Sequence, residues 1–336
     1  MNRRDLLAAL AALGASGYPC LTLSQTTARS PKLGVLSSGP TETLEQWKKS
    51  RFAIKLSELG WTQGRNLAVE FAYDDGVYDR LPALAADLVR KGVDLICAFG
   101  PEAAVTAARA STTIPIVFWG VTFPVEQGLV DSYARPGRNL TGPAWNAGAS
   151  MFAKLFEIIR QLSPDASRVA YFTYPTALRI VTGGETDALD RVMVNAATSL
   201  GMEARAYPIS KREDFEHAFK DMLAFRAQAL IAATTWLSYL ELRRILDFVA
   251  RNRLIGLYDT RQFVDAGGLI SYGTDNQYLR ERVAVYADRI LRGARPGDVP
   301  VEQPTKFAMA INLKTARALG LKIPQQLLLQ ADRVIE

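Results

Sequence analysis

Histidine and cysteine are nearly absent from this chain of 336 residues, which has one histidine and two cysteines. Zinc sites, and nucleophiles activated by a histidine, need more of these residues than the chain offers. His217 falls outside the apolar stripe of its expected helix, formed by Phe215, Phe219, Met222 and Leu223, so we interpret it as a surface residue. The sequence therefore predicts no metal site and no catalytic residue.

Nucleotide-binding and hydrolase motifs are also missing. The chain has no Gly-x-Gly-x-x-Gly, no Gly-x-x-x-x-Gly-Lys-Ser/Thr and no Gly-x-Ser-x-Gly sequence. Asp74 and Asp75 follow an expected strand and could hold a cation, but adjacent acids in a loop are usually solvated. We expect no cofactor, and an enzyme on this architecture is the less favoured interpretation.

The positive charge of the chain is not concentrated. There are 40 Lys and Arg against 34 Asp and Glu, a formal net charge of +6, yet no run of basic residues interleaves with aromatics. Nucleic-acid binding proteins usually show such a cluster. We therefore expect no nucleic-acid partner.

The N-terminus has the layout of an export signal. Two arginines precede the apolar run Leu6 to Ala15, and small and polar residues lead to a Thr-x-Ala sequence that ends at Ala28. The apolar run is too short to span a bilayer. We predict a signal peptide over 1–28, possible export by the twin-arginine route because of the RRDLL sequence, and a periplasmic location. Lipidation at Cys20 is the less favoured alternative, because Pro19 fits a lipobox poorly.

From Lys32 onward, strand-like and helix-like segments alternate. Apolar runs such as KLGVLSS, DLICAF and IPIVFWGV are each followed by an amphipathic segment, and the same order repeats after residue 150. This alternation predicts parallel sheets covered by helices on both faces. The predicted fold class is α/β, with two doubly wound parallel-sheet lobes joined by a multi-segment hinge; a (β/α)₈ barrel fits the unit count as an alternative.

The alternation of strand-like and helix-like segments is interrupted at TGPAWNAGAS, which indicates the boundary between the two lobes. We assign residues 32–143 and 275–336 to the first lobe and 144–274 to the second. A tail strand near 306–312 is allowed to cross to the second lobe.

The expected carboxyl ends of the strands carry hydroxyls, glycines and aromatics. In open α/β sheets ligands bind beyond these ends, where helix N-termini attract anions and aromatic rings enclose apolar groups. Such a set favours recognition over reaction. The candidate ligand-binding residues are Ser37, Ser38, Gly100, Pro101, Glu102, Trp119, Gly120, Thr122, Trp145, Asn146, Tyr174, Thr235, Trp236 and Tyr258.

Several segments resemble a known family, namely YDRLPALAADLVRKGVDLI, TTIPIVFWGVTFPVEQGLV, RPGRNLTG, FVDAGGLISYG and VEQPTKFAMAINLKTARALGLKIP. The chain resembles the extracytoplasmic substrate-binding proteins of ABC transporters, in the group of tryptophan/tyrosine-type binding proteins. The resemblance implies a type I periplasmic-binding fold that encloses a small solute between its lobes. Phe123 stands where this family commonly has Asp, so recognition of an α-ammonium group is in doubt.

The resulting functional expectation is a solute receptor that delivers to membrane permease subunits. We expect a monomer whose ligand is an aromatic or apolar carboxylate or amino acid. The ligand carboxylate is expected to meet backbone N–H groups and hydroxyls at Ser37, Ser38 or Thr122, and the Gly100-Pro101-Glu102 loop, without any Lys or Arg. A binding module that reports to a membrane sensor remains the alternative.

Overall fold

The computed structural model describes residues 29–145, 149–174 and 187–336. The predicted signal peptide, including Cys20, lies outside the described residues. The chain divides into two units, Met1–Ser30 and Pro31–Glu336, and only the second is described below. Within the described ranges no helix has both the length and the apolar character needed to cross a membrane.

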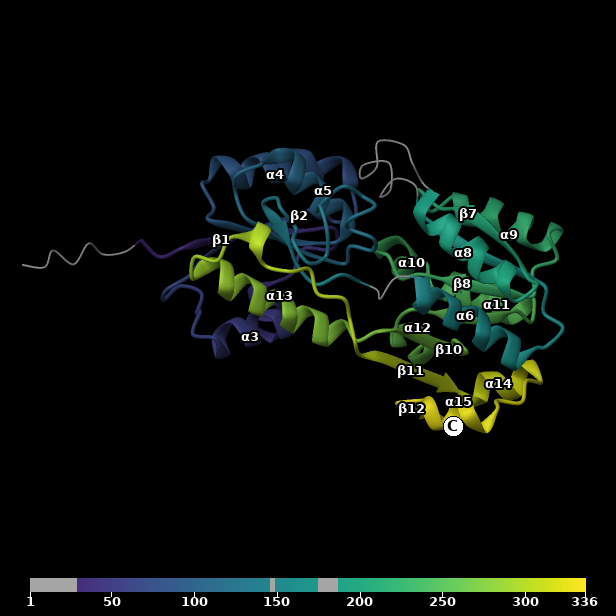
Figure 1. Cartoon of the computed structure of the whole chain (residues 1–336). Coiled ribbons are helices and arrows are strands. Elements are labelled where there is room, and N and C mark those ends of the chain that lie inside the picture. Colours follow the sequence, from purple (N-terminus) through teal and green to yellow (C-terminus); the bar gives the residue numbers. More distant parts are fainter. Residues whose placement is uncertain (1–28, 146–148, 175–186) are drawn as a thin grey trace, which may run out of the picture. The chain divides into compact units, whose positions relative to one another are not determined.

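The first sheet contains five parallel strands in the order β2-β1-β3-β4-β5. Figure 1 labels β1 and β2 of this sheet. Leu33 of β1, which lies between β2 and β3, is opposite both Val69 and Leu95, and this pairing fixes the register on each side. The strands are β1 (Lys32–Ser37), β2 (Ala68–Tyr73), β3 (Leu95–Phe99), β4 (Ile116–Trp119) and β5 (Leu140–Thr141).

Helices cover both faces of this sheet, because its strands are apolar on both sides. Leu95 and Cys97 pack toward α3 and α13, whereas Ile96 and Ala98 pack toward α4 and α5. The alternation follows from the two-residue period of a strand. The helices of this first lobe are α2 (Leu44–Lys49), α3 (Arg51–Glu58), η1 (Tyr78–Arg80), α4 (Leu81–Arg90), α5 (Pro101–Ala110), α13 (Asn276–Leu291) and η2 (Pro296–Asp298).

The second sheet contains seven strands in the order β12-β11-β10-β9-β8-β6-β7, all parallel to their neighbours except the antiparallel pair β10 and β11. The strands are β6 (Arg168–Thr173), β7 (Glu203–Pro208), β8 (Ala229–Ala232), β9 (Ile255–Tyr258), β10 (Ile270–Thr274), β11 (Phe307–Asn312) and β12 (Arg333–Ile335).

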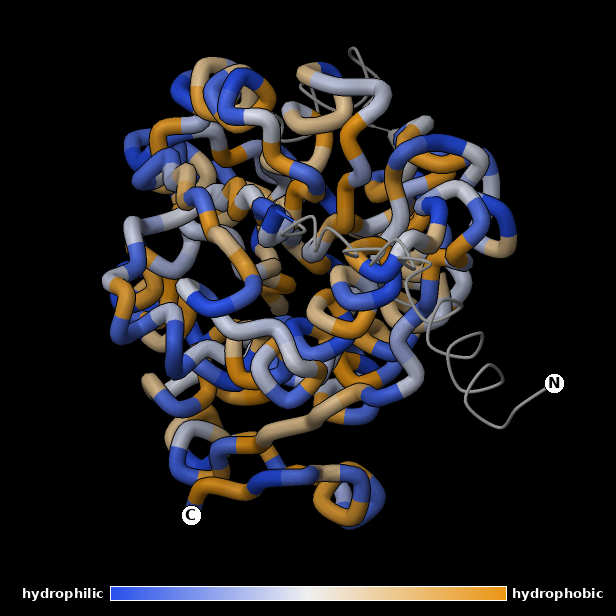
Figure 2. The backbone as a smooth tube through the Cα atoms, turned by 90° about the vertical axis from the view of Figure 1, so that its left-hand side faces the viewer, coloured by the Kyte–Doolittle hydropathy of each residue, from blue (hydrophilic) through white to orange (hydrophobic). Residues whose placement is uncertain are grey.

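This second sheet is also buried on both faces. Val169 and Tyr171 pack against a core that α6, α8, α14 and α15 complete, while Ala170 and Phe172 face the core of α9, α11 and α12. Hydrophobic and hydrophilic residues alternate along the helices (Figure 2), as amphipathic packing requires. The helices of this second lobe are α6 (Ala149–Leu162), α8 (Asp187–Ser199), α9 (Asp214–Ala224), α10 (Trp236–Leu240), α11 (Leu242–Arg251), α12 (Arg261–Asp265), α14 (Leu313–Leu319) and α15 (Gln325–Gln330).

Three chain segments connect the lobes: the one after β5, the short link from β10 to α13, and the stretch from η2 to β11. They are bonded to one another, since Ala144 N donates to Glu302 O at 2.8 Å and the Thr274 hydroxyl donates to Trp145 O at 2.6 Å. The two doubly wound lobes and the multi-segment hinge confirm the predicted fold class.

The C-terminal tail departs from the predicted assignment of 275–336 to the first lobe. α13 packs on the first sheet, but β11 pairs with β10, β12 pairs with β11, and α14 and α15 join the second core. Residues 307–312 form β11 of the second sheet, and the elements after β11 pack in the second lobe. The physical reason is the free edge of β10, which β11 covers.

Candidate functional site

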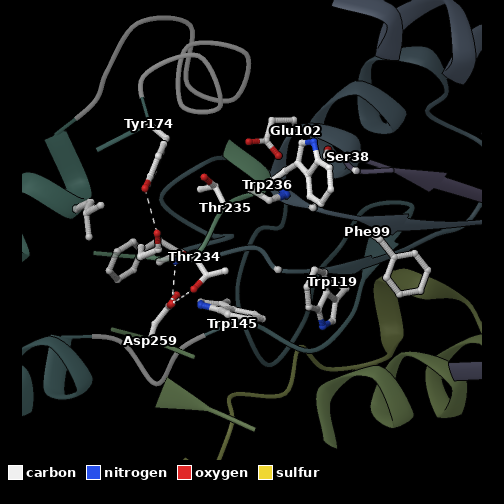
Figure 3. A pocket seen from close by; sticks show the side chains of 18 of the residues that line it. Ser38, Phe99, Glu102, Trp119, Trp145, Tyr174, Thr234, Thr235, Trp236 and Asp259 are labelled. Carbon is white, nitrogen blue, oxygen red and sulfur yellow. Dashed lines mark hydrogen bonds between the residues drawn. The ribbon is translucent and has the colours of Figure 1, made fainter. Parts of the chain in front are cut away.

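A cavity of about 640 Å³ lies beyond the carboxyl ends of strands from both lobes. Small-molecule sites commonly have volumes of about 300–1,000 Å³. The predicted residues that line it are Ser37, Ser38, Gly100, Pro101, Glu102, Trp119, Gly120, Thr122, Trp145, Tyr174, Thr235 and Trp236. Figure 3 shows many of these side chains around one space.

Aromatic rings form much of the cavity wall. Trp119 and Trp145 meet edge to face with 5.1 Å between ring centroids, and Phe99 lies 6.1 Å from Trp119. On the second lobe Trp236 stacks on Tyr239 at 5.8 Å. The arrangement suits a flat or apolar ligand body, because aromatic faces and edges can both contact it.

Local capping positions Trp236. The Thr235 hydroxyl accepts from Ser238 N at the start of α10, and the Ser238 hydroxyl accepts from Thr235 N in return. Nearby, the Tyr174 hydroxyl donates to Ala233 O at 3.0 Å (Figure 3). These hydrogen bonds fix the backbone that follows β8. The Tyr174 and Trp236 rings are therefore held at defined positions in the cavity wall.

Trp236 also touches the first lobe. A Cβ built on Gly76, whose φ is +78°, would come within 2.4 Å of the Trp236 ring atoms Cδ1 and Nε1. The Gly76 turn is held by Asp74, whose Oδ1 accepts from Gly39 N and Gly76 N, both at 2.8 Å. Trp236 thus lies directly on a glycine backbone of the opposite lobe, and only glycine leaves room for it.

Glu102 places a buried carboxyl group in the cavity wall. It follows Pro101 at the start of α5, and its side chain is 3% exposed. Burial raises the pKa of the Glu102 carboxyl to about 7, although its own backbone N–H and the neighbouring Ser38 hydroxyl oppose the rise. The first turn of α5 therefore contains a carboxyl group of the protein itself, that of Glu102.

Asp259 is a second acidic group in the wall, which the sequence analysis did not identify. Its Oδ1 accepts from Thr234 N at 2.8 Å and from the Thr234 hydroxyl at 2.5 Å (Figure 3). Burial raises the pKa of Asp259 to about 6, against the opposing effect of these hydrogen bonds. In the part of the chain that is described, no three His, Cys, Asp or Glu side chains group as a metal site would require.

Arg280 on α13 is a further wall residue that the sequence analysis missed. Its guanidinium carbon lies 5.0 Å from the Trp119 ring centroid and 5.5 Å from that of Phe99. Burial lowers the pKa of Arg280 below its usual range, while the charge of Glu42 works in the opposite direction. The cavity therefore contains a half-buried cation beside its aromatic wall.

Two predicted residues need separate comment. Tyr258 does not line the cavity: it is 1% exposed and stacks on Phe263 at 4.6 Å within the core of the second lobe. Side chains alternate at the end of β9, so Tyr258 points into the core and Asp259 into the cavity. Asn146 lies outside the described residues.

Comparison with known proteins agrees with the geometry of the cavity. The model of the family of ABC transporter substrate binding proteins matches residues 47–335. The chain belongs to this family. This membership confirms the resemblance noted in the sequence, and the function of the protein is substrate binding for an ABC transporter.

Individual relatives of this substrate-binding protein are distant. A tyrosine-binding protein from Clostridioides difficile (strain R20291) is 25% identical over 280 residues, which are 83% of this chain and 78% of the relative. The crystal structure of an ABC domain from Streptococcus pneumonia in complex with L-Trp has a TM-score of 0.80 at 21% identity and covers 91% of this chain and 100% of its own. The ligand-free, open structure of a substrate binding protein with adhesive properties from Clostridium difficile has a TM-score of 0.63 at 20% identity and covers 91% and 99%. These likenesses support the type I periplasmic-binding fold.

Proposed function

We propose that this substrate-binding protein encloses a small aromatic or apolar carboxylate or amino acid between its lobes and delivers it to the permease subunits of an ABC importer. The observation that carries the proposal is the cavity itself, in which Trp119, Trp145, Tyr174 and Trp236 from both lobes surround one space. A tyrosine-binding relative and a tryptophan-bound structural neighbour support this ligand class. The site is built for recognition, and we propose no catalytic role.

The proposal includes the setting in which the protein works. We infer export by the N-terminal signal over 1–28 and a periplasmic location, because a receptor for an importer must meet its ligand outside the cytoplasm. We also infer a monomer, since one chain supplies both walls of the cavity.

A ligand panel tests the proposed ligand class. L-tryptophan, indole-3-propionate and tryptamine share one ring system and differ in whether they carry the carboxylate, the amine or both. A ligand that binds the folded protein should stabilise it by about 2.7 kcal/mol at 100 times its dissociation constant. Thermal-shift measurements should show stabilisation by at least one of the carboxylates, and also by related phenyl acids. A panel without any stabilising carboxylate would contradict the ligand class.

Replacing Trp236 by Ala should weaken binding by about 1–3 kcal/mol, because a large side chain is removed from the cavity wall. Isothermal titration calorimetry with the best ligand of the panel measures the loss. Trp61→Ala is the matched control, since Trp61 lies outside the cavity and bonds Asp288. Unchanged affinity in both Trp236→Ala and Tyr174→Ala would show that the ligand binds elsewhere.

Replacing Gly76 by Ala should weaken binding by about 1 kcal/mol or more, because the added Cβ displaces Trp236 from the opposite lobe. Gly64→Ala is the control: Gly64 has a φ of +80° but has no atom within 4 Å of its built Cβ. Both variants introduce similar backbone strain, and only Gly76→Ala should lose affinity in calorimetry. Equal affinities in the two variants would count against a role for the contact between Gly76 and Trp236 in ligand binding.

A further inference from the structure

We propose that Arg280 is the receptor for the ligand's carboxylate, an inference that rests on the carboxylate-bearing ligand proposed above. Arg280 extends from the second turn of α13 into the cavity wall, beside Phe99 and Trp119. Its guanidinium lies over both rings, which hold it in place and leave its N–H groups for another partner. A planar guanidinium binds a carboxylate through two parallel hydrogen bonds.

Within the part of the chain that the structure describes, Arg280 has no anionic partner. Among the described residues no carboxylate forms an ion pair with it and no acceptor forms a hydrogen bond with it, although Glu42 is near enough to influence its pKa. Its neighbour Arg282 differs, since it bonds Glu302 at 2.6 Å. A half-buried cation without a counter-charge carries a cost in desolvation that no ion pair offsets. A ligand carboxylate would supply the missing charge.

A second unpaired donor, the Trp119 indole N–H, belongs to the aromatic wall beside Arg280. The Trp119 indole Nε1 is buried and lacks a hydrogen-bond partner within the described part of the chain. It belongs to the ring over which the Arg280 guanidinium lies at 5.0 Å. The Trp119 N–H is thus an unpaired donor in the ring against which Arg280 packs, and protein atoms cover it in this structure.

Several backbone donors at the first-lobe loops are already occupied. Ser38 N donates to Phe99 O, Gly39 N to Asp74 Oδ1, and Gly100 N to Trp119 O. The start of α5 offers little more, since Pro101 has no N–H and the Glu102 carboxyl occupies the first turn. A ligand carboxylate at that loop would face another acidic group, whereas at Arg280 it faces a cation.

The test compares an acid with its neutral isostere. Wild-type protein should bind indole-3-propionate at least about 30-fold more tightly than indole-3-propionamide, since losing one partner of a buried charge pair costs about 2 kcal/mol or more. In Arg280→Met this preference should fall to within about threefold, while the affinity for the amide stays near that of the wild type. Arg289→Met, an exposed position on the same helix, should keep the wild-type preference.

The outcomes separate this inference from the proposed function. If the wild type prefers the acid and Arg280→Met keeps that preference, Arg280 is not the receptor, and the carboxylate ligand class stands. If Arg280→Met weakens the binding of indole-3-propionate and of indole-3-propionamide equally, the role of Arg280 is structural and the inference fails. If Arg280→Met does not fold, Arg280→Lys should retain the charge but reduce the preference, and an undiminished preference there would overturn the inference. Failure of the wild type to bind either compound or L-tryptophan would overturn both proposals.

Discussion

Replacing Glu102 by Gln should flatten the dependence of stability on pH between about 4.5 and 7. The Glu102 carboxyl has a pKa of about 7 in the folded protein against 4.5 for an ordinary glutamate. The folded state therefore holds a proton that the unfolded state has lost across this range, so the free energy of unfolding falls as the pH rises. The full effect is on the order of 3 kcal/mol, from a difference of about 2.5 pKa units at 1.36 kcal/mol each.

Urea unfolding at a series of pH values measures this effect. The wild type should lose stability relative to Glu102→Gln as the pH increases, and the difference should level off above pH 7. Asp259, with a pKa raised to about 6, contributes in the same direction in both proteins and so cancels from the comparison. Glu45→Gln, which removes an exposed carboxylate on α2, should run parallel to the wild type. Parallel curves for Glu102→Gln and the wild type would contradict the assignment.

Replacing Gly273 by Ala should destabilise the protein by about 2 kcal/mol or more and reduce ligand binding with it. A Cβ on Gly273 would lie 2.0 Å from Asp259 O and 2.8 Å from Asp259 C, so the backbone of β10 or of Asp259 must move. Such a shift displaces the Asp259 carboxyl from Thr234 and disturbs the hinge that begins at Thr274.

Chemical unfolding and calorimetry on the same preparation test both parts of this prediction. Gly39→Ala is the stability control, because the nearest atom to its built Cβ is 3.9 Å away and its backbone is unstrained. If Gly273→Ala had the same free energy of unfolding as Gly39→Ala, the prediction would be wrong, because β10 would then move without any loss of stability.

The fold was predictable because it depends on periodicity. Runs such as Leu95–Phe99 are apolar at every position, and the structure shows why: successive residues pack into different cores on the two faces of the sheet. The end of the second lobe was harder to assign. The segment 307–312 is apolar, but the sequence does not indicate that β10 has a free edge for it.

The cavity residues were predictable as a region and less so as individual side chains. Strand ends indicate where the cavity forms, but whether Tyr258 or Asp259 faces it depends on the residue at which β9 stops pairing. No pattern in the sequence indicated that Arg280 lines the cavity. It is one of several arginines spaced along α13, and only the packing of that helix on the first sheet decides which of them meets Trp119.

The three crossings between the lobes have a consequence for synthesis on the ribosome. Val283 and Ala287 of α13 complete the face of the first sheet that Leu33 and Cys97 line, yet they are translated after most of the second lobe. β11 and β12, which finish the second sheet, are translated later than α13. The core between the first sheet and α3 therefore stays incomplete while most of the second lobe is made, and the core that needs β11, α14 and α15 closes later still. We expect chaperones to hold the nascent chain while these apolar faces are uncovered.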